Sequence, residues 1–178
     1  MKVAKKTIRA LTKMCRRIEK PAAIIVRIGR QRLYLVRGRK VIESYPVSSS
    51  RFGIGNRAGS NKTPLGRHVI CQKIGRDAKL GTIFRSRRNT GRVARIWRRR
   101  RTMTDHITTR ILRLKGLEPG INKGRGIDSL KRHIYIHGTP AESLLGTPAS
   151  SGCIRMANRD IVELFDFVNR GTIVRICR

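Results

Sequence analysis

The sequence predicts a single, mainly β domain with about eight strands and one or two helices. Three observations lead to this fold class. Short runs rich in β-branched residues recur along the chain, separated by turn residues. A later run alternates apolar and polar residues, as strands do, and only one segment shows the clear periodicity of a helix. With 178 residues, the chain is long enough for one domain with a substantial core and short for two.

The first half of the chain reads as a meander of strands followed by a long loop. Residues 48–66 are rich in Ser and Gly, and we expect a loop because another strand-like run follows. This loop lacks the Gly-Lys-Ser/Thr ending of a phosphate-binding loop, so phosphate binding is not predicted. We expect strands at residues 22–28, 32–36, 41–47 and 67–74.

The second half contains the predicted helix. Residues 75–132 form the least regular part, with one expected strand at 108–116. Residues 133–138 alternate as a half-buried strand would. We expect a helix in residues 158–171, with Asn158 as its N-cap, Gly171 at its end and an apolar face of Ile161, Leu164, Phe165 and Val168. Residues 172–177 predict a closing strand.

The charge of the chain is extreme, with 42 Lys+Arg against 10 Asp+Glu and a formal net charge of +32. Such self-repulsion favours an anionic partner: nucleic acid, an anionic cell wall or an anionic membrane surface. Residues 85–132 hold sixteen Lys/Arg against three acids, whereas residues 133–169 are nearly neutral. Trp97 beside Arg98–Arg101 has the composition to stack on a base and hold phosphates, or forms a solvated surface. The distribution predicts two functional faces.

The N-terminal segment is predicted to lie outside the domain. Residues 1–20 are basic and lack the continuous apolar core of a recognisable secretory signal. An amphipathic helix, a frayed arm and an organellar targeting segment all remain open, and the domain is expected at residues 21–178. No apolar run approaches the ~18–20 residues that cross a bilayer.

Cysteine and histidine spacing argues against a disulfide framework or a metal site. The four cysteines are far apart and form no C-x-x-C pair, and the four histidines add no metal-ligand spacing. No metal and no cofactor are therefore predicted. The cysteines are Cys15, Cys71, Cys153 and Cys177.

One cysteine and one histidine are placed as a nucleophile and its base would be. Cys153 follows a flexible Gly152 shortly before the predicted helix, and His137 ends the alternating strand. A strand-loop-helix return of this length can bring the imidazole to the sulfur, with turn amides facing an oxyanion. A buried structural cysteine with an unrelated histidine is the alternative, and spacing alone does not decide between them.

Longer stretches of the sequence resemble a known family. "YIHGTPAESLLGTPASSGCIRMAN", residues 135–158, resembles the signature of the L,D-transpeptidase (YkuD-like) domain, in which His-Gly on a strand precedes a Ser/Thr-His-Gly-Cys turn. Residues 31–70 are similar to the family's N-terminal hairpin and Thr-Pro-x-Gly loop, and residues 108–124 to the central region of a proteobacterial branch. The resemblance covers about residues 22–178 and implies an L,D-transpeptidase-type β-sandwich with one or two short helices.

The resemblance also implies a reaction on peptidoglycan stem peptides. Cys153 would attack the carbonyl of the L-centre of meso-diaminopimelate in a tetrapeptide stem, expelling D-alanine. An amine acceptor, or water, would then resolve the thioester. His137 would take the thiol proton, with its ring oriented by the carbonyl of Gly138, and amides near Gly152 would hold the oxyanion.

The candidate substrate-binding residues implied by the family are Arg155, Ser150 and Ser151. Arg155 would steer a substrate carboxylate or fix the turn, and Ser150 occupies the family's Ser/Thr position. Ser151 is a departure, because the family usually has His there. The family also implies a location in the cell envelope, although no signal segment is recognisable. The alternative function is a non-catalytic RNA-binding structural protein, a ribonucleoprotein component, built on the same fold.

Overall fold

The computed structural model describes residues 23–96 and 106–178 and confirms the mainly β prediction. The predictions for residues 1–20, Trp97 and Arg98–Arg101 fall outside these residues. In chain order, the elements are β1 (Ala23–Arg27), a 3₁₀ turn (Ile28–Arg30), β2 (Arg32–Arg37), β3 (Lys40–Ser48), β4 (Gly66–Ile74), β5 (Thr82–Arg85), β6 (Arg88–Val93), β7 (Ile107–Gly116), β8 (Tyr135–Gly138), a second 3₁₀ turn (Glu142–Leu144), β9 (Ile154–Met156), α2 (Asn158–Phe167) and β10 (Ile173–Cys177).

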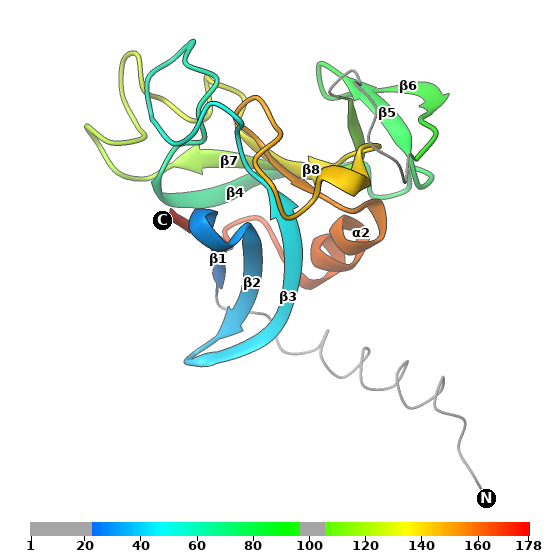
Figure 1. Ribbon diagram of the computed structural model, residues 1–178, viewed down its shortest axis with the longest axis horizontal. Coiled ribbons are helices and arrows are strands. Elements are labelled where there is room, and N and C mark those ends of the chain that lie inside the picture. The colour runs from blue at the N-terminus through cyan, green and yellow to red at the C-terminus, as the bar shows by residue number, and fades with distance from the viewer. Residues whose placement is uncertain (1–22, 97–105) are drawn as a thin grey trace, which may run out of the picture.

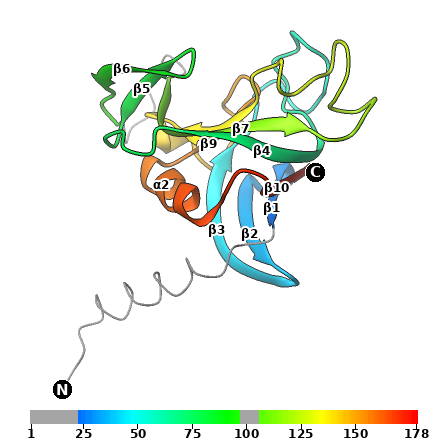
Figure 2. The ribbon, with the colours of Figure 1, turned by 180° about the vertical axis from the view of Figure 1, so that it is seen from behind.

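The strands form one sheet that closes on itself. Its order is β4-β10-β1-β2-β3-β9-β8-β7, and β7 pairs again with β4, which completes a ring (Figure 1). The β5–β6 hairpin extends from β7 outside this ring and stands apart from it in both views (Figures 1 and 2). The nine-residue β4 can reach both neighbours because its register shifts between Ile70 and Gln72, where a bulge bends the strand. The structure thus has the mainly β architecture implied by the family resemblance, and its two expected sheets are joined into one continuous, closed sheet.

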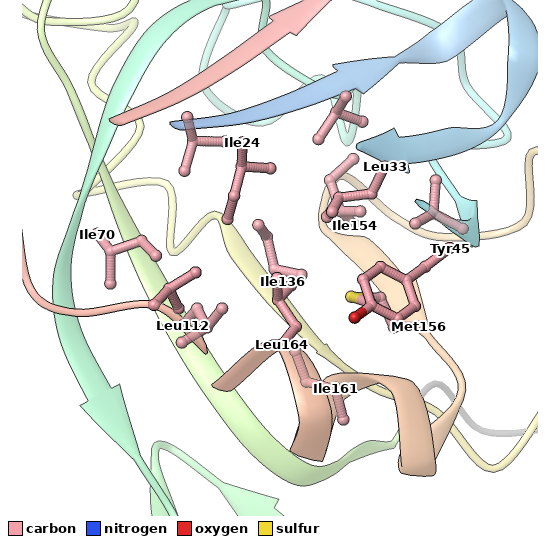
Figure 3. Close-up of a cluster of buried hydrophobic side chains, with 14 of the residues drawn as sticks. Ile24, Leu33, Tyr45, Ile70, Leu112, Ile136, Ile154, Met156, Ile161 and Leu164 are labelled. Carbon is pink, nitrogen blue, oxygen red and sulfur yellow. The ribbon is translucent and has the colours of Figure 1, made fainter. Parts of the chain in front are cut away.

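The hydrophobic core fills the inside of this ring. Alternate residues of the strands point inward, and α2 contributes Ile161 and Leu164, of which Leu164 lies next to Ile136 (Figure 3). Full burial of each such aliphatic side chain stabilises the fold by about 1.5–3 kcal/mol. The other labelled members of this cluster are Ile24, Leu33, Tyr45, Ile70, Leu112, Ile154 and Met156.

Helix α2 has the predicted apolar face but different ends. Its N-cap is Ala157, with no side-chain cap, so the prediction of Asn158 as the cap was wrong. Asn158 is instead the first helical residue and is fully buried, because its amide group is used inside the protein. The helix ends at Phe167 rather than near Gly171, and Val168 follows in an extended conformation.

Two other expectations differ from the structure. Residues 75–132 contain the β5–β6 hairpin, which was not predicted, in addition to the expected strand. Strand β8 is buried on both faces rather than half-buried, because β5 and Cys153 cover the side that faces away from the core. Every side chain of β8 therefore lies in a protein interior.

No helix in the described part of the chain is long and apolar enough to cross a membrane. Cys71, Cys153 and Cys177 are free thiols.

Candidate active site

Strand register brings the predicted histidine and arginine together on one face of the sheet. In the parallel β8–β9 pair, His137 lies beside Arg155, and on the other side of β8 it lies beside Ile111 of β7. Ile136 and Ile154 belong to the core inside the ring. Because successive strand residues point to opposite faces, His137 and Arg155 face outward from the core.

The Cys153 thiol lies on this same face, one row away. The backbone N–H of Tyr135 donates to Sγ of Cys153 at 3.4 Å, and the thiol donates to the carbonyl oxygen of His133, also at 3.4 Å. The side chain is half-buried against a small apolar cluster that includes Phe84 and Tyr135. Neighbouring strands lie ~4.8 Å apart and residues two apart along a strand ~7 Å, so Cys153 and His137 are diagonal neighbours. The register thus places the two residues on the same face of neighbouring strands.

The imidazole of His137 is held in one tautomer. The side chain is 2% exposed, and Nδ1 lies 2.8 Å from the carbonyl oxygen of Gly138. A carbonyl oxygen only accepts, so Nδ1 carries the proton and Nε2 is the basic nitrogen of the neutral ring. The expectation that Gly138 orients the ring agrees with this geometry.

Gly138 must be glycine because other groups occupy the space of a side chain. A Cβ atom there would lie 2.7 Å from Oδ1 of Asn158 and 2.8 Å from the carbonyl oxygen of Thr108. Asn158 is itself fixed by four side-chain hydrogen bonds. It accepts from the hydroxyls of Thr108, at 2.7 Å, and Thr109, and donates at 2.7 Å to Thr139 O and to Oε1 of Glu142. The start of α2 is therefore locked to β7 and to the strand that carries His137.

The turn before Cys153 is braced by buried hydroxyls. Ser150 is fully buried, and its hydroxyl donates to Cys153 O at 2.6 Å and accepts from the N–H of Gly152 at 3.2 Å. Gly152 has φ +124°, and its carbonyl accepts from Oγ1 of Thr63 at 3.0 Å. The Gly152 N–H already donates to the Ser150 hydroxyl, so it can reach an oxyanion only if the turn shifts. Its role in holding an oxyanion therefore stays a prediction.

An open hollow of about 300 Å³ adjoins this turn. The exposed Ser151 forms one wall, and Arg132 and Ile134 form another. The remaining lining residues come from two loops that lie side by side, at Ala58, Gly59, Asn61, Gly126, Ile127, Asp128 and Lys131. Of the predicted substrate-binding residues, Ser151 reaches this hollow, while Arg155 is only 5% exposed.

Arg132 is a neighbour of the thiol that the sequence did not indicate. Its guanidinium donates to three loop carbonyls, Gly55 O at 3.2 Å, Asn56 O at 2.8 Å and Lys62 O at 2.6 Å. Burial lowers the pKa of Arg132, and the smaller effect of negative charge on Cys153 raises it. A positive charge that interacts with Cys153 in this way favours the thiolate form. In a chain with 42 basic residues, the sequence offers no signal that singles it out.

The chain belongs to the family of L,D-transpeptidase catalytic domains. The model of that family, YkuD, matches residues 21–176. A Bacillus licheniformis protein named L,D-transpeptidase YkuD is 52% identical over 46 residues, which cover 26% of this chain and 28% of that protein. An Escherichia coli K12 protein named L,D-transpeptidase YcfS is 28% identical over 165 residues, covering 86% of this chain and 43% of that protein.

Solved structures share the fold. An L,D-transpeptidase from Mycobacterium smegmatis matches with a TM-score of 0.54 at 16% identity, covering 89% of this chain and 59% of that one. L,D-transpeptidase 3 from Mycobacterium tuberculosis, solved with a faropenem-derived adduct, matches with a TM-score of 0.52 at 16% identity, covering 89% and 61%. The chain thus corresponds to less than two thirds of the length of each of these relatives.

Proposed function

We propose that this chain acts on peptidoglycan as a cysteine L,D-transpeptidase. In the first half of the reaction, the Cys153 thiolate bonds to the carbonyl carbon of the L-centre of meso-diaminopimelate in a donor tetrapeptide stem. The bond from that carbon to nitrogen breaks, and D-alanine leaves with the proton that His137 took from the thiol. In the second half, an acceptor amine attacks the thioester carbonyl and gives a proton to His137. The bond from carbon to sulfur breaks, and His137 returns the proton to the Cys153 thiolate.

The observation that carries this proposal is the placement of the thiol and the imidazole. Cys153 and His137 lie diagonally on one face of β8 and β9, and the hydrogen bond of Nδ1 to Gly138 O leaves Nε2 as the base. The thiolate form is supported by the N–H of Tyr135 and the charge of Arg132. The match of the L,D-transpeptidase family model to residues 21–176 supports the reaction class.

The hollow beside Ser151 is proposed as the entry for the donor stem. It adjoins the turn that carries Cys153, and its walls supply the hydroxyl of Ser151 and the cations Lys131 and Arg132. Arg155 and Ser150 are buried beside the reacting groups, so we assign them to holding the geometry around His137 and the turn, with Arg155 within reach of a substrate carboxylate if the turn opens.

A penem adduct tests the nucleophile directly. The structure of the Mycobacterium tuberculosis relative contains a faropenem-derived adduct, so we expect intact-mass spectrometry of this protein after incubation with faropenem to show one covalent adduct. Cys153→Ala should abolish the adduct, and the matched control Cys71→Ala, another half-buried thiol, should keep it. An adduct that survives Cys153→Ala, or no adduct in the unaltered protein, would refute the proposal.

We further propose that the excess basic charge holds the protein on an anionic wall polymer. With a net charge of +32, binding to isolated cell-wall sacculi should fall steeply as salt rises. Sacculi stripped of their anionic polymers should bind much less, and equal binding to stripped sacculi would contradict this. The family match gives no support to the alternative of an RNA-binding structural protein.

A further inference from the structure

Arg113, Tyr135 and Cys153 form a row of neighbouring residues across strands β7 and β8 and the residue just before β9. In the β7–β8 pair, Arg113 lies directly beside Tyr135, and the N–H of Tyr135 donates to Sγ of Cys153. Arg113 and Tyr135 therefore point to the same outward face as the thiol. The Nη2 atom of Arg113 donates weakly to Leu130 O at 3.5 Å, and its Nε atom is buried with no hydrogen-bond partner. This guanidinium thus has unused donor capacity beside the candidate active site.

A second guanidinium reaches the same row from the β5–β6 hairpin. Arg87 lies at the hairpin tip and donates to the hydroxyl of Tyr135 at 3.2 Å. It has φ +68°, a conformation that non-glycine residues rarely adopt, so the backbone there is held against its preference. The hairpin therefore places Arg87 over the face that carries Cys153.

The two guanidinia converge near His133, whose carbonyl accepts from the thiol. Burial lowers the pKa of His133, and the charges of Arg87 and then Arg113 lower it further. Neither arginine forms an ion pair with Asp or Glu within residues 23–96 and 106–178. Both positive charges are thus uncompensated, and a planar carboxylate that accepts hydrogen bonds from both guanidinium groups would neutralise them.

We propose that Arg87 and Arg113 form a carboxylate-binding rim at the Cys153 thiol, and that it binds a free carboxylate flanking the scissile bond of the donor stem. The identity of the ligand as a stem peptide rests on the proposed function. Two carboxylates have the right chemistry: that of the departing D-alanine and that of the D-centre of diaminopimelate. Tyr135 is a positioning residue, because its hydroxyl holds Arg87 in place.

The rim is tested first without any peptidoglycan. Iodoacetate and iodoacetamide alkylate the same thiolate and differ in one carboxylate, so the ratio of their rate constants at Cys153 reports local recognition of that group. Peptide mapping also measures this ratio of rate constants at Cys71 and Cys177. These two values serve as references that correct for the effect of the high overall charge. We expect Cys153 to favour iodoacetate more than the other two thiols do, and Arg87→Gln and Arg113→Gln each to lower its ratio roughly 3-fold or more.

The ratio separates recognition from thiol activation. If an arginine merely lowers the thiol pKa, its removal slows both reagents equally and leaves the ratio unchanged. The matched control is Arg92→Gln, an exposed arginine of the same hairpin, which should leave the ratio unchanged. An unchanged ratio in the double variant Arg87→Gln with Arg113→Gln would overturn the proposal, even if the protein turns over stem peptides.

Amidated stems then identify the carboxylate. A tetrapeptide amidated at the carboxylate that binds the rim should lose kcat/KM in the unaltered protein, and the double variant should no longer distinguish it from the unmodified stem. A tetrapeptide amidated at the other carboxylate should react normally. If no stem reacts at all, the proposed function fails while the alkylation ratio still decides whether the rim exists. Equal reaction of all three stems would contradict a stem carboxylate as its ligand.

Discussion

Gly138 shows how a single residue without a side chain controls the candidate base. Its carbonyl oxygen fixes the His137 ring, while its Cα faces Thr108 and Asn158 at distances that leave no room for a methyl group. At this residue, the requirement for close packing and the requirement for ring orientation coincide.

We expect Gly138→Ala to lower both stability and thiol reactivity. The added methyl group would lie 2.8 Å from the backbone oxygen of Thr108, which cannot rotate away, so the backbone must shift and carry the His137 acceptor with it. The cost is on the order of 1–3 kcal/mol of unfolding free energy, measurable by urea denaturation. Gly29→Ala is the matched control, because its Cβ would meet only a backbone carbon of Arg178 at 3.9 Å. Equal midpoints for the two variants would contradict the packing argument.

At the scale of elements, Asn158 joins the first turn of α2 to its neighbours. Its buried amide bonds to Thr108 of β7 and to Thr139 just after β8. Asn158→Ala should destabilise the fold by roughly 2–3 kcal/mol, because buried hydroxyls and a carbonyl lose their partner. Thermal unfolding measures this loss. Arg159→Ala, at the exposed next residue, is the control and should change the unfolding free energy little. A loss of unfolding free energy no larger than that of the control would mean that water replaces the amide of Asn158, and would contradict the prediction.

The β5–β6 hairpin depends on an unusual turn. Arg85 and Arg88 pair across it, and both connecting residues, Ser86 with φ +48° and Arg87, have positive φ, as a two-residue type I′ turn requires. Ser86→Val should loosen the hairpin by about 1–2 kcal/mol, because β-branched residues avoid this conformation, whereas Ser86→Asn should preserve it. Amide hydrogen exchange of the hairpin measures the difference. Equal exchange in both variants would rule out strain at the turn.

For the whole molecule, His68 makes stability depend on pH. It is fully buried, with Nδ1 3.0 Å from Gly66 O and Nε2 2.9 Å from the hydroxyl of Ser129, and burial is the main cause that lowers its pKa to about 4. In the unfolded chain, His takes up a proton below about pH 6.5, so acidification from there to about 4 favours unfolding.

The expected loss over this range is about 3 kcal/mol, from a shift of about 2.5 pKa units at 1.36 kcal/mol each. Urea denaturation between pH 7 and pH 4 measures it. His68→Gln lacks the titrating group, so its stability should change less over the same range, and this comparison removes the contribution of carboxyl groups. If both proteins lose equal stability on acidification, His68 is not the cause.

The sequence predicted the strands and the helix whose hydrophobic pattern is strong. β1, β2, β3, β4, β7, β8 and β10 follow β-branched runs, and α2 follows its apolar face. The β5–β6 hairpin was missed because every residue of β6 is exposed and its turn has Ser-Arg instead of Asn-Gly. β9 was missed because a strand of three residues is too short to show an alternation of apolar and polar residues. Ring closure through β4 and β7 depends on pairing between distant segments, which local patterns do not encode.

At the candidate site, the motif predicted Cys153, His137 and Gly138 as reacting residues, and the register of β8 and β9 defines how they lie relative to one another. The cations around the thiol were not predictable. Arg87, Arg113 and Arg132 come from a hairpin, a strand and a loop, and nothing in a chain so rich in arginine distinguishes them from solvated ones. Only the fold brings Arg132 into interaction with Cys153, and Arg87 and Arg113 to Tyr135, the residue whose N–H contacts the thiol.

The order of strands in the ring has a consequence for synthesis in the cell. β10, the strand of the ring that is synthesised last, lies between β4 and β1, which are synthesised much earlier. While residues 173–177 remain inside the ribosome, the nascent protein exposes two unpaired strand edges and part of its core. Closure of the ring must therefore await the exit of residues 173–177 from the ribosome, and until then the two open strand edges are prone to aggregation.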